Sequence, residues 1–322
     1  MGFTPSFRSK RGGVRICNPL LNSLRDYLTG VTSSNMQKVK KAIILMAGLG
    51  TRFLPLSKIL PKENFPLLDK PLFYYIVKEV IDSGISEIIF VLSPKNKFVL
   101  NYFKKLPELE RVLKTQNKEG ILQELKNLEE LFKNVSFKCV LQQNPLGSAQ
   151  AVLLAKNFVN GEATAVLFVD DIIEADPPCL LQLIQIFKTC NSPVIALSRI
   201  PKEKISYYGV VKPEKITSRL CKIKKFIEKP RPDQAPSDLA VVGRTIFTPE
   251  VFDYLEKIKP SQKKEIIIND ILDKILEDGK MIYGYEFKGK WLECGDKDRW
   301  IKSFLYLASK EEKYKKYLKE IK

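Results

Sequence analysis

Residues 40–66, with the sequence KKAIILMAGLGTRFLPLSKILPKENFP, place glycines and cations directly after an apolar run. The run ends in a glycine-rich turn, and Arg52, Lys58 and Lys62 follow it at short intervals. Backbone N–H groups of such a turn can approach a ligand closely, and nearby cations favour an anion. The segment therefore predicts a phosphate site, although a tight turn that needs glycine only for its conformation is the alternative.

The glycine turn fits neither of two common phosphate motifs. The GxxxxGK(S/T) pattern of P-loop ATPases cannot be placed on AGLGTR, and Phe53 stands where the dinucleotide fingerprint GxGxxG needs its third glycine. The chain also contains no histidine. This composition excludes Ser-His-Asp and Cys-His catalysis, histidine-ligated zinc and a histidine general base.

The charge of the chain suits a small anionic substrate better than a nucleic acid. The formal net charge is +17, but seven Lys or Arg and one acid lie in the first 40 residues, and lysines elsewhere mix with glutamates as on a solvated face. No nucleic-acid module is recognisable, and no apolar run approaches the ~20 residues that span a membrane. The six cysteines show no CxxC spacing, so neither a zinc ribbon nor a disulfide framework is expected, and a cytoplasmic location is predicted.

Short apolar runs alternate with helical patterns from residue 40 onward. Strands are expected at residues 41–46, 87–92, 137–142, 164–169 and 193–198, and helices at about 72–83, 97–105, 147–158 and 178–189. Nearly continuous Val, Ile and Leu runs joined by helices indicate a parallel sheet that is covered on both faces. After Ser198, runs punctuated by Pro and Gly are typical of antiparallel strands. The sequence therefore predicts an α/β fold, in which a Rossmann-like mostly parallel sheet carries a β-rich C-terminal elaboration.

The whole segment AGLGTRFLPLSKILPKENFPLLDKP resembles the signature of the sugar-1-phosphate nucleotidyltransferase family, in which a G-x-G-T-R loop precedes P-K-E and then D-K-P. The resemblance extends over most of residues 39–300. The segments that carry it are VDD (169–171), YYGVV (207–211), FIEKP (226–230), APSDLAVVGRTIFTPEVF (235–252) and FKGKWLECGDK (287–297).

The chain is expected to form one domain with an appendage at each end. Residues 1–35 lack periodicity and are expected to be a disordered extension, or alternatively a targeting segment. The nucleotidyltransferase domain is expected over residues 36–310, with the polar segment 106–134 as a helical insertion that packs locally or against a second subunit. Residues 311–322 are expected to be the basic end of a C-terminal helix.

The resemblance implies an enzyme in which glucose 1-phosphate attacks the α-phosphorus of UTP, giving UDP-glucose and pyrophosphate with Mg²⁺ as cofactor. Because the nucleophile is already an anionic phosphate oxygen at neutral pH, the absence of histidine is compatible with this chemistry. Catalysis then reduces to positioning and charge stabilisation. The implied partners are UTP and glucose 1-phosphate, without nucleic acid or membrane, and the implied assembly is a homodimer or homotetramer.

The resemblance also assigns site residues, motif by motif. The catalytic cations are Arg52, Lys62 and Lys229; the nucleotide side comprises Ala47, Gly48, Glu63, Gln142 and Gly147; the sugar-phosphate side comprises Gly209, Glu228, Lys229 and Val241; the metal ligands are Asp170 and Glu293. Gln142 is expected to read the uracil edge through its amide, and Gly147 to leave room for the base. Asp170 is expected at the carboxyl edge of the sheet, where such folds place ligands, with Asp171 rather capping the next segment.

Three departures from the family pattern keep other functions open. Residues 147–150 read GSAQ, which is closer to thymidylyltransferase relatives, so a thymidylyltransferase-type enzyme is one alternative. Glu293 stands where the family usually has an aspartate, and Ile267 where it tends to have a glutamine. A catalytically silent paralogue with a regulatory role is therefore the second alternative.

Overall fold

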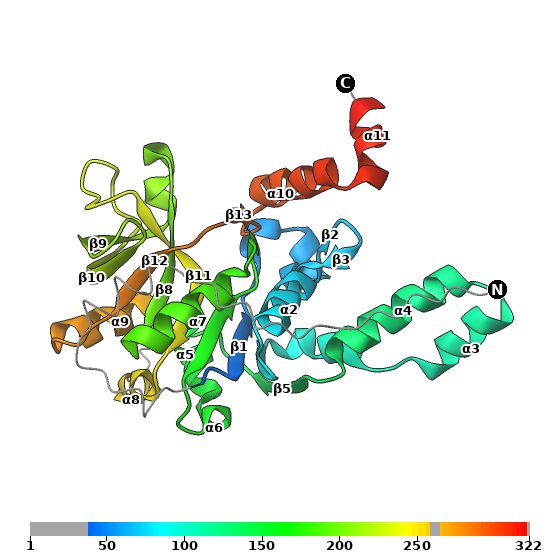
Figure 1. Ribbon diagram of the computed structural model, residues 1–322, viewed down its shortest axis with the longest axis horizontal. Helices are drawn as coiled ribbons and strands as arrows, with labels where there is room; N and C mark the ends of the chain where they lie inside the picture. Colours follow the sequence, from blue (N-terminus) through cyan, green and yellow to red (C-terminus); the bar gives the residue numbers. More distant parts are fainter. Residues whose placement is uncertain (1–37, 258–264, 321–322) are drawn as a thin grey trace, which may run out of the picture.

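The computed structural model describes residues 38–257 and 265–320, so the expected extension over residues 1–35 lies outside the described residues. Nine strands form one mixed sheet in the order β5-β4-β1-β6-β11-β8-β12-β10-β9 (Figure 1). Their bounds are β1 (Lys41–Met46), β4 (Glu87–Leu92), β5 (Ser136–Leu141), β6 (Thr164–Phe168), β8 (Val194–Arg199), β9 (Gly209–Lys215), β10 (Leu220–Glu228), β11 (Leu239–Phe247) and β12 (Tyr283–Glu286).

The first half of the sheet is parallel, as the sequence predicts. Strand β1 pairs in parallel with β4 and with β6, and β4 pairs in parallel with β5. All six residues of β1 are buried. The predicted bounds 41–46 and 87–92 are those observed. Of the other three, β6 ends one residue earlier than predicted, β5 lies one residue earlier at both ends, and β8 lies one residue later at both ends. Because these strands run the same way, their carboxyl ends meet at one edge of the sheet.

The second half is continuous with the first. Strand β11 lies between β6 and β8 and is antiparallel to both, whereas β12 is parallel to β8. Strands β9 and β10 form an antiparallel pair at the end of the sheet. The expected α/β class is confirmed, and the β-rich part proves to be an extension of the main sheet rather than a separate layer.

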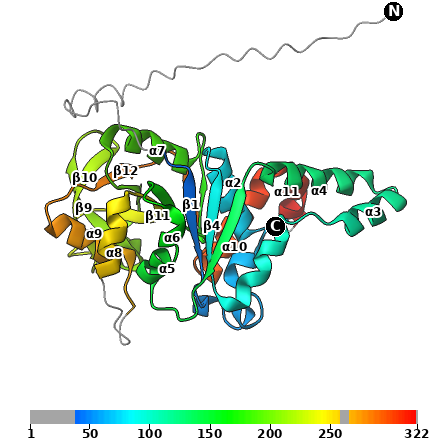
Figure 2. The same cartoon turned by 90° about the horizontal axis from the view of Figure 1, so that it is seen from below.

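Helices cover both faces of the sheet (Figure 2). On one face, α2 (Leu72–Asp82) and α7 (Cys179–Cys190) share a core with Ala42, Ile44 and Met46 of β1. On the other face, Ile43 and Leu45 belong to a second core. Its helices are α5 (Ser148–Leu154), α8 (Pro249–Lys257) and α9 (Ile268–Glu277). Successive side chains of β1 therefore alternate between two apolar layers, which is why its sequence shows no polar residue after Lys41.

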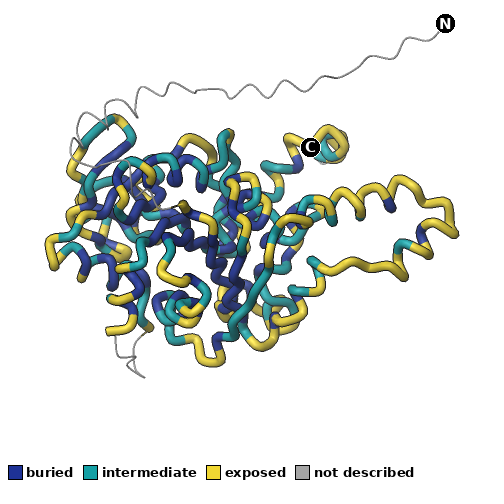
Figure 3. The backbone as a smooth tube through the Cα atoms, turned by 60° about the horizontal axis from the view of Figure 1, so that its bottom comes forward, coloured by how far each residue is buried: buried dark blue, intermediate teal, exposed yellow. Residues whose placement is uncertain are grey.

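Two helices of the expected insertion project from the body (Figures 1 and 3). They are α3 (Pro107–Thr115) and α4 (Glu119–Phe132), and most of their surface is exposed. The chain ends in α10 (Lys297–Lys310) and α11 (Glu312–Glu320), with α10 capped by the Asp296 side chain. Within the described ranges, no helix has both the length and the apolar character that crossing a membrane requires.

Candidate active site

The glycine-rich turn directly follows β1. Ala47 is buried at the strand end, whereas Gly48 is exposed. Gly50 has φ +64°, a left-handed conformation that glycine adopts without a Cβ clash. This bend starts the short 3-10 helix η2 (Thr51–Phe53), from which the Nη1 of Arg52 donates to the carbonyl oxygen of Gly295 at 3.3 Å. The turn thereby carries Arg52 to the carboxyl edge of the sheet.

Lys62 and Asp170 form an ion pair at this edge. The Nζ of Lys62 lies 2.5 Å from the Oδ2 of Asp170, and their side chains are 18% and 21% exposed. Burial disfavours the charged form of Asp170, but the Lys62 ammonium outweighs burial and lowers the pKa of Asp170 below its ordinary value. The same pairing outweighs burial for Lys62 and raises its pKa. Both groups are therefore charged near neutral pH.

A two-stranded hairpin brings the second predicted metal ligand beside the first. Strands β7 (Asp171–Glu174) and β13 (Lys290–Glu293) pair so that Glu293 lies opposite Asp171. A Cβ added at Gly295 would lie 3.5 Å from the Oδ2 of Asp170 and 3.5 Å from the Oε1 of Glu293. The two carboxylates therefore border the same small space.

Glu293 already has two partners in this space. Tyr208 donates its hydroxyl to Oε2 of Glu293, and the Nη1 of Arg299 bonds to Oε1. Burial raises the pKa of Glu293, against the opposing effects of Tyr208 and Arg299. The Arg299 guanidinium also lies 5.1 Å from the ring centroids of Tyr207 and Tyr208, a cation–π geometry that fixes its position.

The donor set is compatible with a divalent cation that prefers oxygen. Asp170 and Glu293 offer carboxylates to one space, and Mg²⁺ commonly takes one or two protein carboxylates and completes its shell with phosphates and water. Among residues 38–257 and 265–320, no group of three or more Asp, Glu, Cys or His could hold a metal by itself. A metal here would depend on a phosphate substrate for its remaining ligands.

A pocket of about 260 Å³ extends from these carboxylates between β9, β10 and α9. Seven predicted residues line it: Arg52, Asp170, Gly209, Glu228, Lys229, Val241 and Glu293. The Nδ2 of Asn269 donates to the Oε2 of Glu228 at 3.1 Å, and the Nζ of Lys229 lies 3.6 Å from Oε1 of the same carboxylate. Polar groups that suit sugar hydroxyls and a phosphate thus share one cavity with the carboxylate pair.

Lys229 has an unusual backbone conformation. Its φ is +45°, a left-handed conformation that is uncommon for a residue with a Cβ. Its N–H donates to the carbonyl oxygen of Tyr208 at 3.1 Å, which holds the end of β10 against the start of β9. Strain of this kind costs on the order of 1–3 kcal/mol and clusters at functional sites. It sets the direction in which the chain leaves Glu228.

None of the predicted nucleotide residues lines this pocket. Gln142 follows the carboxyl end of β5, and its Nε2 donates to the carbonyl oxygen of Gly147 at 3.2 Å and to the side chain of Gln150. Gly147 has φ +105°, and an added Cβ would meet the carbonyl oxygen of Ile266 at 2.3 Å. Contact with the backbone of Ile266 is therefore enough to require glycine here, and the expectation that Gly147 also leaves room for the base stays a prediction. The next residue, Ser148, lines the pocket.

Glu63 differs from its expected place beside the uracil. Its side chain is fully buried, and its Oε1 accepts from the Nδ2 of Asn96 at 2.6 Å. Burial raises the pKa of Glu63 to about 7. In the 3-10 helix η4 (Lys62–Asn64), neighbouring side chains point in different directions, so Lys62 faces Asp170 while Glu63 points into the body. Glu63 anchors the loop instead of reaching the pocket.

Several pocket residues were missed by sequence reasoning. Tyr208, Asn269, Trp291 and Arg299 all line the cavity. The pair Tyr207–Tyr208 stands inside the quoted YYGVV segment, but nothing local connects it with Glu293, which lies 85 positions away. Arg299 lies two residues after the segment FKGKWLECGDK (287–297), and nothing in its sequence context identifies it as a site residue.

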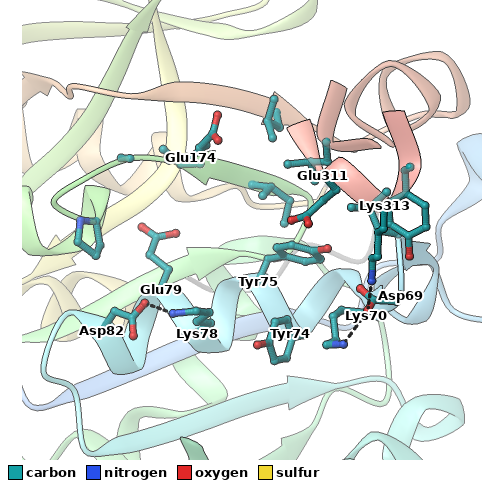
Figure 4. A pocket seen from close by; sticks show the side chains of 18 residues that line it. Asp69, Lys70, Tyr74, Tyr75, Lys78, Glu79, Asp82, Glu174, Glu311 and Lys313 are labelled. Carbon is teal, nitrogen blue, oxygen red and sulfur yellow. Dashed lines mark hydrogen bonds and ion pairs between the residues drawn. The ribbon is translucent and has the colours of Figure 1, made fainter. Parts of the chain in front are cut away.

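Figure 4 shows a second cavity, of about 550 Å³, which shares none of its lining residues with the first. It is lined by α2, by Ile172 and Leu292 of the hairpin, and by the junction of α10 and α11. None of the predicted site residues belongs to it. Although this cavity is larger, the paired charges that the expected chemistry needs lie in the smaller one.

Comparison with known proteins agrees with this geometry. Residues 41–310 match the family model for nucleotidyl transferases. UTP–glucose-1-phosphate uridylyltransferase of Bacillus subtilis (strain 168) is 38% identical over 283 residues, which are 88% of this chain and 96% of that protein. Its counterpart in Staphylococcus haemolyticus (strain JCSC1435) is 37% identical over 290 residues, 89% of this chain and 99% of that protein.

Solved structures agree with the sequence matches. UTP-bound UGPase from Acinetobacter baumannii superposes with a TM-score of 0.80 at 31% identity, covering 88% of this chain and 98% of that one. UDP-glucose pyrophosphorylase complexed with UDP-glucose superposes with a TM-score of 0.76 at 32% identity, covering 85% of this chain and 100% of that one. The chain therefore belongs to the nucleotidyl transferase family, in the group that contains the UTP–glucose-1-phosphate uridylyltransferases.

Proposed function

We propose that this protein converts UTP and glucose 1-phosphate into UDP-glucose and pyrophosphate. One observation carries the proposal: Arg52 and Asp170 line the same pocket as Glu228 and Lys229. Groups suited to a triphosphate and groups suited to a sugar phosphate therefore meet in one cavity. That arrangement suits a reaction between two anions.

The sugar phosphate would occupy the side of the pocket formed by β9, β10 and α9. Glu228 and Asn269 form a hydrogen-bonded pair that presents an acceptor and an amide to sugar hydroxyls. The Lys229 ammonium would neutralise the phosphate, and the backbone at Gly209 and Val241 would line the ring. A non-bridging oxygen of this phosphate is the nucleophile, and it needs no proton removed at neutral pH.

UTP would lie along the carboxyl edge of β1 and β5. The backbone at Ala47 and Gly48 and the amide of Gln142 would contact the nucleoside, once Gln142 exchanges its present bond to Gln150 for the uracil edge. Arg52 and Lys62 would bind the triphosphate. Their positive charges would stabilise the negative charge that develops as pyrophosphate leaves.

We propose that Asp170 and Glu293 hold Mg²⁺ together with the substrate phosphates. When bound, the ion supplies positive charge that neutralises the phosphate oxygens. Lys62 would then turn from Asp170 towards the triphosphate, and Glu293 would give up part of its bonding to Tyr208 and Arg299. Compared with aspartate, Glu293 has an extra methylene, and the bonds that Tyr208 and Arg299 keep to its carboxylate would orient the longer side chain towards the metal.

The proposed assembly is a homo-oligomer. Leu109, Val112 and Ile121 of the α3–α4 hairpin are 43%, 47% and 54% exposed, which suits contact with a second subunit. We also propose a cytoplasmic location, with which the five free cysteines among the described residues are compatible. Light scattering coupled to size-exclusion chromatography would report the number of subunits.

The direct test measures pyrophosphate release by the purified protein with UTP, glucose 1-phosphate and Mg²⁺. We expect one pyrophosphate for each UDP-glucose, and no release when either substrate or the metal is omitted. Replacing UTP with dTTP should slow the reaction, and faster turnover of dTTP would identify a thymidylyltransferase. UTP binding without turnover of any sugar phosphate would instead identify a catalytically silent relative.

A further inference from the structure

Arg244 is a fully buried cation that the proposed reaction does not use. Its side chain is 0% exposed, although arginine is almost never buried so completely unless it is paired. It lies on β11, the strand inserted between β6 and β8. Taking a guanidinium out of water is unfavourable unless its charge and its N–H groups are satisfied.

Glu79 on α2 balances this charge. The Nε and Nη2 of Arg244 lie 3.0 and 2.8 Å from the Oε2 of Glu79. The other carboxylate oxygen of Glu79 accepts from the backbone N–H of Leu180, at the start of α7, at 3.0 Å. Figure 4 shows Glu79 on α2 beside the second cavity. The pair thus ties α2 and α7 to the centre of the sheet.

Two further N–H groups of Arg244 bind the turn that carries Asp170, while a third donates to the carbonyl oxygen of Gly243 at 2.8 Å. Its Nη1 donates to the carbonyl oxygen of Phe168 at 3.1 Å, and its Nη2 to that of Asp171 at 2.5 Å. These two carbonyls stand on either side of Asp170 in the chain. The rigid, planar fork of a guanidinium can bridge them, whereas a single ammonium cannot.

Asp171, the residue after Asp170, joins the same turn to the hairpin that carries Glu293. One carboxylate oxygen of Asp171 accepts from the backbone N–H of Gly243 at 3.0 Å, and the other from the indole N–H of Trp291 at 2.8 Å. Arg244 and Asp171 therefore act on one short segment. Together they join the segment that carries Asp170 to β11 and to the hairpin that carries Glu293.

We infer that Arg244 is a positioning residue, which fixes the backbone on both sides of Asp170 so that this carboxylate and Glu293 face one divalent cation. The inference rests on the proposed function, because it concerns the metal of that reaction. Stability alone does not require this arrangement, since a buried ion pair is often no more stabilising than apolar residues of similar volume. What apolar residues could not supply is the pair of bonds to the carbonyl oxygens of Phe168 and Asp171.

The test is a double variant, Glu79→Gln with Arg244→Met. The glutamine retains an acceptor for the N–H of Leu180, and neither new side chain leaves a buried charge unpaired. A second variant, Arg244→Lys, retains the charge opposite Glu79 but cannot bridge both carbonyls. Lys41→Met is the matched control, because Lys41 is a cation with an 8% exposed side chain at the opposite end of β1.

The readout is binding of Mn²⁺ and a non-hydrolysable UTP analogue, followed by water-proton relaxation, which responds to metal immobilised on the protein. Circular dichroism and thermal unfolding would establish that each variant is folded. Loss of groups that orient metal ligands typically weakens metal affinity about 10- to 100-fold. We expect the affinity for Mn²⁺ to fall by that factor in the double variant, to fall less in Arg244→Lys, and to stay unchanged in Lys41→Met.

Two results would overturn the inference in distinguishable ways. Folded variants that bind Mn²⁺ as tightly as the unaltered protein would refute the positioning role and leave the proposed function intact. An unaltered protein that immobilises no Mn²⁺, even with the nucleotide analogue present, would refute the metal site and the positioning role together. If the double variant does not fold, Arg244→Lys decides between the same outcomes.

Discussion

Lys62→Met tests the ion pair at the centre of the site. The substitution keeps most of the side-chain volume but removes the ammonium that lies 2.5 Å from Asp170. Breaking a fully buried pair costs about 3–5 kcal/mol, because the remaining charge is left without a partner. The two side chains are 18% and 21% exposed, so water screens the remaining carboxylate in part, and we expect a loss of about 2 kcal/mol. For a domain of this size that corresponds to a Tm lower by about 3–4 °C.

The loss of stability in Lys62→Met should depend on pH in a defined direction. The pKa of Asp170 is lowered in the folded state, so its pairing stabilises the protein above the ordinary aspartate pKa of about 3.9 and ceases to do so as the pH falls through the lower folded value. The pKa of Lys62 is raised, so its contribution is present below about 10.4 and disappears as the pH rises through the folded value. The difference between the two proteins should therefore be constant around neutral pH and shrink in strong acid.

Thermal unfolding with and without Mg²⁺ is the assay. Mg²⁺ should restore part of the lost stability, because a cation beside Asp170 replaces the missing ammonium, while turnover stays reduced by about 100-fold or more, as is usual when a group that stabilises transition-state charge is lost. Lys78→Met is the matched control, since its pair with Asp82 is also 2.5 Å long but the side chains are 47% and 39% exposed. It should change stability by no more than about 0.5 kcal/mol. Equal losses in the two variants, or no effect of Mg²⁺, would refute the reasoning.

Three further substitutions test other parts of the site, and the first of them has a control at a glycine elsewhere in the chain. Gly147→Ala should destabilise the protein by about 3 kcal/mol or more in urea unfolding, because of overpacking against the backbone of Ile266. Gly84→Ala, at φ +84° with open space around it, should lose only about 1 kcal/mol, and similar losses would remove the packing argument. Lys229→Ala should raise the KM for glucose 1-phosphate at least tenfold while the KM for UTP changes little; equal changes would contradict its place beside the sugar phosphate. Asp170→Asn should abolish Mg²⁺-dependent turnover with the fold retained by circular dichroism, and undiminished turnover would exclude it as a ligand.

Much of the fold could be predicted because its signals are local. Strand β1 is a run of apolar residues with a glycine turn behind it, and its predicted bounds are those observed. The position of β11 could not be predicted in the same way. Its sequence indicates a strand, but the choice of β6 and β8 as neighbours depends on contacts between distant segments.

The site, like the fold, has features that the sequence could predict and features that depend on contacts between distant segments. The resemblance to the family's motifs was enough to name Asp170, Glu228 and Lys229, which the structure brings to one pocket. It could not give the direction of a side chain, so Glu63 was expected beside the base although it points into the body. Nor could it give Arg244, whose partner on α2 lies 165 positions away in the chain.

The stereochemistry at the α-phosphorus tests the central claim most directly, because that claim is a single direct attack by one substrate on the other. UTP carrying sulfur at the α-phosphorus in one known configuration would be turned over with glucose 1-phosphate, and the configuration of the resulting sugar nucleotide determined by phosphorus NMR. A direct in-line displacement predicts inversion. Retention would show two successive displacements through a covalent intermediate on the protein, and would contradict the account.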